Sequence, residues 1–206
     1  MSCSNSFKSV AATALTVVTL LAASGAQASL FTRLNSKAVY DDVAKLTWLQ
    51  DANANGVMNW ADAKTWAAGL SIEGVSGWRL PGGTMVDDYN QTASEMGNMF
   101  YTVLGGSADQ DITTTHTNVT NYAFFQNIPS TINAFWSGVG VDDTYAWLFN
   151  FSNGTQFPYY KTTDLFAWAV RSGDVPEPGA LALLGAGLLG WVGVKRSRRA
   201  GESIGA

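Results

Sequence analysis

With 206 residues the chain has room for one domain of ordinary size plus targeting segments, and its formal net charge is −4. The charge is uneven, because residues 29–174 hold seven Lys and Arg against fourteen Asp and Glu, a net charge of −7. Nucleic acid and anionic lipid are therefore poor partners for this part. The single cysteine is Cys3, so residues 29–174 hold no disulfide, thiol nucleophile or cysteine zinc site.

The N-terminal segment has the pattern of a secretory signal peptide. Lys8 precedes an almost wholly apolar run at residues 10–23, and Ala26-Gln27-Ala28 is a small-x-small cleavage site. We expect signal peptidase to cut after Ala28, which makes residues 1–28 the signal peptide and residues 29–174 the mature domain. A retained signal anchor is disfavoured, because the apolar run is short.

Residues 31–70 predict short strands followed by a loop and a helix. Residues 38–41 and 45–49 form two strands around an acidic turn, and residues 31–34 form a strand or a loose arm. Asn59 suits the N-cap of a helix that runs to about Leu70, and Asp62 three residues later completes a capping-box-like pair.

The loop before this helix also has the spacing of a twelve-residue calcium loop, with oxygen side chains at positions 1, 3 and 5 and Gly56 at position 6. The six candidate ligands are Asp51, Asn53, Asn55, Val57 through its carbonyl, Asn59 and Asp62. At position 12 the side chain of Asp62 is shorter than the usual glutamate. Calcium binding and a metal-free capped turn therefore both remain open.

The middle of the chain predicts a second helix and a long loop. Apolar residues recur at helical spacing within residues 89–104, and Gly105 follows them. Residues 107–120 are polar and predict a surface loop that holds the only histidine, His116. A lone histidine in such a loop is expected to be exposed rather than catalytic.

From residue 135 onward the pattern is that of β-strands. Strands are expected at 135–137, 145–151, 156–160 and 165–171, with Asn153-Gly154 as a two-residue hairpin turn. On the second strand the side with Tyr145 and Trp147 is the heavier one and should face the core. The exposed candidates for binding sugar are then Tyr159, Tyr160, Asp142 and Asp143.

The C-terminal end has three consecutive parts: a Pro-Glu-Pro motif, an apolar run at residues 179–194, and a basic cluster at residues 195–199. Sixteen helical residues span about 24 Å, less than the roughly 30 Å of a hydrocarbon core, and Trp191 with the flanking basic residues would cover the difference. We expect a membrane-spanning sorting helix within residues 175–200, followed by a tail at 201–206.

This end resembles the PEP-CTERM sorting signal of Gram-negative bacteria that make extracellular polysaccharide. The resemblance implies recognition by an exosortase and cleavage near residues 176–178, from a precursor held in the inner membrane. It also implies export to the cell surface or matrix. The matching residues are Pro176, Glu177, Pro178, Arg196, Arg198 and Arg199. An ordinary single-span anchor is the alternative.

Four short motifs in the body form a recognisable set: Asn59-Trp60-x-x-Ala63, Trp78-Arg79-Leu80-Pro81, Phe135-Trp136-Ser137 and Ala169-Val170-Arg171. They resemble the domain of unknown function named for the C-terminal domain of the collagen-like Lcl adhesin, over about residues 39–171. The resemblance implies an α+β, C-type-lectin-like fold with two short helices packed on small antiparallel sheets. It also implies extracellular placement and, in some members, trimerisation or glycan binding. The net charge of −7 suits sulfated glycans poorly.

These features predict a non-enzymatic exported protein that binds or associates with exopolysaccharide. A glycosidase would need two carboxylates about 5–10 Å apart, and no spacing singles out such a pair. A purely structural matrix protein is the alternative, and a carbohydrate-active hydrolase is a weaker one. The expected partners are signal peptidase, exosortase, extracellular polysaccharide and a second copy of the chain, with calcium as the one expected cofactor.

Overall fold

The computed structural model describes residues 28–130 and 133–175, which form an α+β domain with two sheets. The first sheet is antiparallel and has the order β1-β2-β3-β9. Its strands are β1 (Leu30–Arg33), β2 (Ala38–Asp41), β3 (Leu46–Leu49) and β9 (Val170–Ser172). The predicted strands at 38–41 and 45–49 are thus confirmed, and of the two possibilities for residues 31–34 the structure has the strand.

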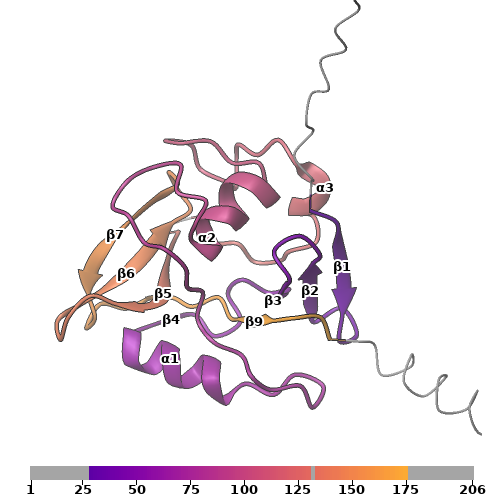
Figure 1. Cartoon of the computed structure of the whole chain (residues 1–206), viewed down its shortest axis with the longest axis horizontal. Coiled ribbons are helices and arrows are strands. Elements are labelled where there is room, and N and C mark those ends of the chain that lie inside the picture. The colour runs from indigo at the N-terminus through magenta and orange to yellow at the C-terminus, as the bar shows by residue number, and fades with distance from the viewer. Residues whose placement is uncertain (1–27, 131–132, 176–206) are drawn as a thin grey trace, which may run out of the picture.

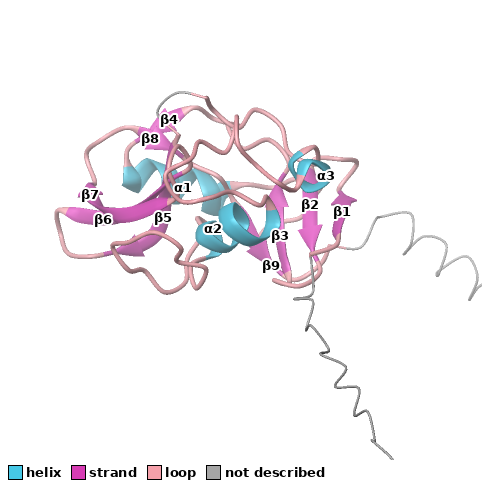
Figure 2. Ribbon diagram, turned by 90° about the horizontal axis from the view of Figure 1, so that it is seen from above, coloured by secondary structure: helices cyan, strands magenta, loops and turns pink. Residues whose placement is uncertain are grey.

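The second sheet has five strands in the order β4-β8-β5-β6-β7, and only the β5–β8 pair is parallel. Its strands are β4 (Val57–Met58), β8 (Leu165–Phe166), β5 (Ala134–Gly140), β6 (Tyr145–Asn150) and β7 (Thr155–Tyr160). Figures 1 and 2 show the two sheets at opposite sides of the molecule, with α2 between them, and Figure 1 shows α1 along the lower edge, below β4 and β9.

The helices are short, and two of them lie where the sequence predicts helices. They are α1 (Trp60–Gly69), α2 (Glu95–Gly97), which continues into the π-helical turn η1 (Asn98–Val103), and α3 (Val119–Tyr122). Helix α1 begins at the predicted N-cap, because the Asn59 side chain accepts a hydrogen bond from the Asp62 amide at 3.0 Å. In the described part of the chain, no helix is long and apolar enough to cross a membrane. The predicted sorting helix at 179–194 lies outside the described residues.

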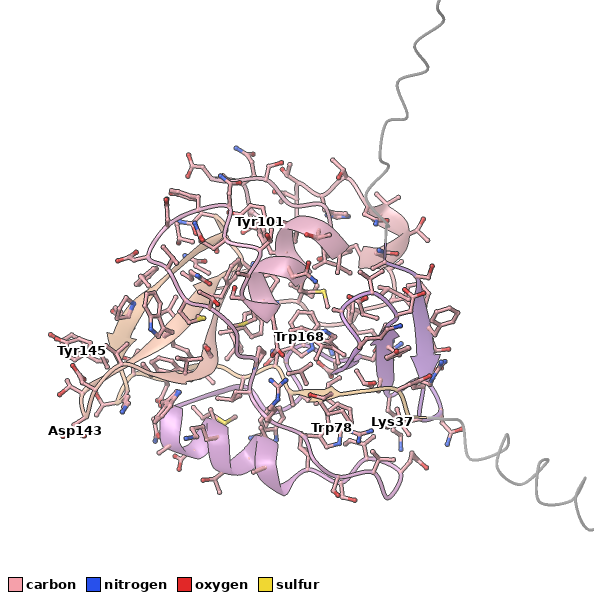
Figure 3. The ribbon with its side chains drawn as sticks, in the orientation of Figure 1. Lys37, Trp78, Tyr101, Asp143, Tyr145 and Trp168 are labelled. Atoms are coloured by element: carbon pink, nitrogen blue, oxygen red, sulfur yellow. The ribbon has the colours of Figure 1, made fainter. Side chains whose placement is uncertain are left out.

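Large aromatic side chains form the core between the sheets. Trp168 lies near its centre in Figure 3 and makes edge contacts with Trp48 at 5.2 Å and Phe125 at 5.1 Å between ring centroids. Its indole N–H donates to the Leu49 carbonyl at 2.8 Å, so the buried polar atom is satisfied. Burial is nearly complete for Trp48, Trp78, Trp136 and Trp168, whereas Trp60 and Trp66 are half-buried on the edge of the core.

The predicted last strand at 165–171 is wrong as a single element. The chain pairs with β4 and β5 at β8, leaves that sheet, and joins the other sheet at β9. Ala167, Trp168 and Ala169 lie between the two strands and are buried. Residues 165–171 therefore link the two sheets. The segment is apolar because its middle, with the indole of Trp168, is buried in the core.

Strand β6 and its turn also differ from the prediction. Both of its faces are covered in the middle, since Leu148 and Phe149 are neighbours in sequence and are both buried. The turn to β7 has four residues, because Asn150 pairs with Thr155. Gly154 in this turn has φ +83° and lies against Tyr101, whose hydroxyl donates to its carbonyl at 2.8 Å.

Both ends of the described chain belong to the four-stranded sheet. The Ser29 amide donates to Asp42 Oδ1 at 2.8 Å, just before β1. After β9, Asp174 accepts two hydrogen bonds from the Arg33 guanidinium, at 2.7 and 2.9 Å. Val175 is buried at the last described position. The folded domain thus extends to the residue before the Pro-Glu-Pro motif.

Candidate functional site

Exposed tyrosines gather at one end of β6 and β7. Tyr145 and Tyr160 are directly opposite in the strand register, and their ring centroids are 4.7 Å apart. The next residue, Tyr159, has its ring centroid 6.1 Å from that of Tyr160. Tyr159 is 39% exposed and Tyr160 is 52% exposed. These three residues form what we call the tyrosine face.

The sequence missed Tyr145 as a member of this face. It was expected to point into the core with the other aromatic residues of its strand, but it is only half-buried, and its ring packs against that of Tyr160 at an angle of 38°. Ala146 and Leu148 are buried, whereas Tyr145 and Trp147 are half-buried, so at this end of β6 the core lies on the face opposite to the predicted one. The position of Tyr145 next to a glycine- and aspartate-rich turn was the available signal.

The predicted acidic residues stand in the turn next to the tyrosines. Figure 3 shows Asp143 and Tyr145 together at this end of the molecule. Asp142 Oδ1 accepts hydrogen bonds from the amides of Tyr145 and Thr144, both at 2.7 Å, and these bonds lower the pKa of Asp142. Asp142 therefore stabilises the turn, and the exposed Asp143 has its carboxylate free for other contacts.

Two lysines pack on the ring of Trp60 in α1, and one of them, Lys161, directly follows Tyr160. The ammonium groups of Lys64 and Lys161 each lie 4.4 Å from the ring centroid of Trp60, a cation–π distance. The indole N–H of Trp60 donates to the Ser137 carbonyl at 2.8 Å, which fixes the ring against β5. Lys161 also donates to the Asp142 carbonyl. Helix, sheet and acidic turn are thus tied together beside the tyrosines.

In the proposed calcium loop, the candidate ligands at the start and at the end of the loop make separate hydrogen bonds to other protein groups. At its end, Asn59 Nδ2 donates to Asp62 Oδ2 at 2.7 Å, so this pair is engaged in capping α1. At its start, Asp51 accepts from the Asn53 amide and from Asn127 Nδ2, both at 2.9 Å. Val57 lies in β4, opposite Phe166.

One observation in this loop fits a cation. The side-chain oxygen of Asn53 is buried and has no hydrogen-bond partner, which is costly unless another group meets it. Among residues 28–130 and 133–175, no three His, Cys, Asp or Glu side chains converge as a metal site. A cation here would therefore rely on amide and main-chain oxygens as well as on the two carboxylates.

The Arg79 side chain braces the loops that follow α1. Its two terminal nitrogens donate to the two oxygens of Glu95, both at 2.7 Å, and this bond raises the pKa of Arg79. The amide of Gly82 also donates to Glu95 Oε2 at 2.7 Å. This two-point pairing with a carboxylate is the contact that the planar guanidinium group of an arginine favours.

His116 is less exposed than expected from its polar loop. Its ring stacks on Tyr122 with 3.9 Å between centroids, and Nδ1 lies 2.8 Å from the Ile112 carbonyl oxygen. Ile112 within the same loop is fully buried. These contacts give His116 a packing role in anchoring the loop to α3.

Of the processing residues, the structure describes only Ala28, which is 7% exposed. The Pro-Glu-Pro motif and the basic cluster lie outside the described residues: Pro176, Glu177, Pro178, Arg196, Arg198 and Arg199. Their roles remain predictions from the sequence.

Comparisons with known proteins give two matches along the chain. The family model of the Lcl C-terminal domain matches residues 37–171, and the model of the PEP-CTERM protein-sorting motif matches residues 174–199. No curated protein matches the chain.

Proposed function

Because the chain belongs to the Lcl C-terminal domain family and carries a PEP-CTERM sorting motif, we propose that it holds polysaccharide at the cell surface or in the extracellular matrix. The motif implies an exported protein with a membrane-anchored precursor that exosortase processes. Beyond export, we propose that the ligand is a polysaccharide, that the protein is not an enzyme, and that its fold is of the C-type-lectin-like kind. The proposed fold is supported by the four-stranded sheet, which contains both the first and the last strand of the domain.

The tyrosine face carries the proposal. Tyrosine rings have an electronegative face that attracts the C–H groups of a sugar ring, and their hydroxyls can bond sugar hydroxyls. Tyr159 and Tyr160 expose such rings, and Tyr160 packs against Tyr145, which follows the exposed Asp143 by two residues. Binding a sugar suits this face better than hydrolysing one. The carboxylate of Asp142 already accepts hydrogen bonds from two main-chain amides of the turn, so it is engaged in holding the turn.

Retention on the exopolysaccharide of the producing cells tests this function. The processed protein is purified from those cells and passed over the immobilised polysaccharide. Tyr159→Ala and Tyr160→Ala should each weaken retention at least tenfold, equivalent to about 1.4 kcal/mol. Tyr159→Phe should retain most of the binding, because it keeps the ring and loses only the hydroxyl.

The matched control is Phe31→Ala on β1, which removes an aromatic ring of similar exposure, 44%, from the other sheet. It should bind as the wild type does. If neither the wild type nor any variant is retained, the protein is a structural component of the matrix. If the tyrosine variants bind normally, the polysaccharide does not bind at this face.

A further inference from the structure

We propose that a groove beside α1 is a second carbohydrate site, which binds a short stretch of neutral sugar. The groove has a volume of about 420 Å³, within the range of small-ligand pockets. The residues that define this α1 groove are Ser36, Gln50, Trp66, Leu70, Ile72 and Gln126. This inference takes its ligand class from the proposed function, but its site is separate from the tyrosine face.

The two sites lie on opposite sides of the molecule. Lys37, which also lines the α1 groove, and Tyr145 are at opposite ends of the view in Figure 3. The groove belongs to the side of the four-stranded sheet, since Lys37 directly precedes β2 and Gln50 directly follows β3. One short sugar could therefore not contact both sites.

The backbone holds the polar side of the groove in place. The Gln126 amide donates to the Gln50 carbonyl at 2.9 Å, and the Ala52 amide donates to the Gln126 carbonyl at 2.9 Å. These bonds join two segments that are far apart in sequence. The two glutamine side chains therefore project from a rigid main-chain ladder rather than from free loops.

The apolar side comes from α1 and the turn that follows it. Trp66 and Leu70 are four residues apart and thus lie on the same side of the helix end. Ile72 is held by two main-chain hydrogen bonds with Val75, at 3.0 and 2.9 Å. All three apolar side chains pack on the core and remain partly exposed.

The charged groups that border the groove are already compensated. The Lys37 ammonium donates to the carboxylate of Glu73. The two oxygens of Asp51 accept from the Asn53 amide and the Asn127 side chain. A charged ligand would therefore gain little from these groups, and a neutral ligand is favoured.

The uncharged polar groups, by contrast, have no protein partners. In the described part of the chain, no hydrogen bond forms to the side chains of Gln50, Gln126 or Ser36, or to the indole N–H of Trp66. Four indoles of the described chain donate to carbonyl oxygens at 2.8–3.0 Å: Trp60, Trp78, Trp136 and Trp168. The indole N–H groups of Trp48 and Trp147, like that of Trp66, form no hydrogen bond within the described residues.

These groups match the chemistry of a sugar. Each glutamine amide offers donors and an acceptor to neighbouring hydroxyls, and the indole N–H offers one more donor. The ring of Trp66 with Leu70 and Ile72 provides an apolar surface for the C–H face. Two sites on opposite sides would let one protein bridge two strands of polysaccharide, or bind one long strand with avidity.

Short neutral oligosaccharides separate the two sites. They are released by partial hydrolysis of the exopolysaccharide and titrated calorimetrically into the processed protein from the producing cells. Gln126→Ala and Trp66→Phe should each weaken binding at least fivefold. Gln110→Ala removes an exposed glutamine from another loop, and it should bind as the wild type does.

The tyrosine variant keeps the two proposals distinguishable. Tyr159→Ala should leave oligosaccharide binding at the α1 groove unchanged, even though it weakens retention on the polymer. Unchanged binding in Gln126→Ala, loss of binding in Tyr159→Ala, or binding of charged fragments only would each overturn the inference. So would an absence of oligosaccharide binding by the wild type. Gln126→Ala alone decides the outcome if Trp66→Phe lowers the melting temperature.

Discussion

Asp174 lies one residue before the end of the folded domain. The hydrogen bonds from Arg33 lower its pKa below the ordinary value of 3.8, and the Val175 amide adds a further bond to the carboxylate. A carboxyl group with a lowered pKa in the folded state stabilises the fold only while it is ionised. That contribution is complete above the ordinary pKa and is lost as pH falls through the folded pKa.

We therefore predict that Asp174→Asn lowers the melting temperature at neutral pH and that the difference shrinks at acid pH. Melting curves of both proteins between about pH 7 and pH 3 measure this difference. The effect should be modest, because the Asp174 side chain is 37% exposed and the pair is screened by solvent. Asp164→Asn removes an exposed carboxylate and should show a small difference at every pH. A constant difference for Asp174→Asn would contradict the ionic explanation.

At the scale of elements, the sequence predicted those structures whose signal is local. The N-cap of α1 is such a case, because Asn59 and Asp62 make the bond that their spacing predicts. The path of residues 165–171 could not be predicted, because alternation is the same whether a segment stays in one sheet or changes sheets. The anchoring contact of that segment is the bond from Trp168 to Leu49, 119 residues away.

The candidate sites show the same limit. Tyr159 and Tyr160 are exposed as predicted, but strand alternation does not explain both, because consecutive residues point to opposite faces of a sheet. Their exposure comes from their place at the end of β7, and their binding role remains a prediction. The α1 groove could not be found from sequence, because Gln50 and Gln126 meet only through long-range main-chain bonds. The indole N–H of Trp66 is seen to lack a partner only in three dimensions, because helical spacing does not show which side-chain atoms form hydrogen bonds.

Calcium belongs to the scale of the loop at residues 51–62. We predict that millimolar calcium raises the melting temperature of the protein, because a bound ion would meet the unpartnered oxygen of Asn53. Binding stabilises by mass action, about 2.7 kcal/mol at a hundredfold excess over the Kd. Asp51→Asn should abolish the rise, while Asp164→Asn should keep it. If the melting temperature responds to neither calcium nor a chelator, the loop is a capped turn that binds no metal.

At the scale of the whole molecule, the sorting motif begins in the sequence where the folded domain ends. Asp174 is held by Arg33 and Val175 is buried, so the domain needs its chain up to residue 175. The motif match begins at residue 174. Processing that removed Val175 would therefore disturb the fold, whereas cleavage within residues 176–178 would not.

We accordingly predict that the processed surface protein keeps Val175 and lacks the basic cluster at residues 195–199. Intact-mass analysis of the protein isolated from the cell surface measures both ends of the chain. A mass that includes Ala206 would show that exosortase does not cut the chain and that the tail is a plain membrane anchor. A mass that ends before Val175 would contradict the structural limit on the cleavage site.

The contact between Ser29 and Asp42 has a consequence at the other end of the chain. In the precursor the donor is a peptide amide, which carries no charge. Cleavage after Ala28, as the sequence predicts, turns that nitrogen into a terminal ammonium group. The hydrogen bond then becomes an ion pair with a carboxylate already in place 2.8 Å away. Removal of the signal peptide would thus create a positive charge on the Ser29 nitrogen, and the ion pair with Asp42 would stabilise the start of β1.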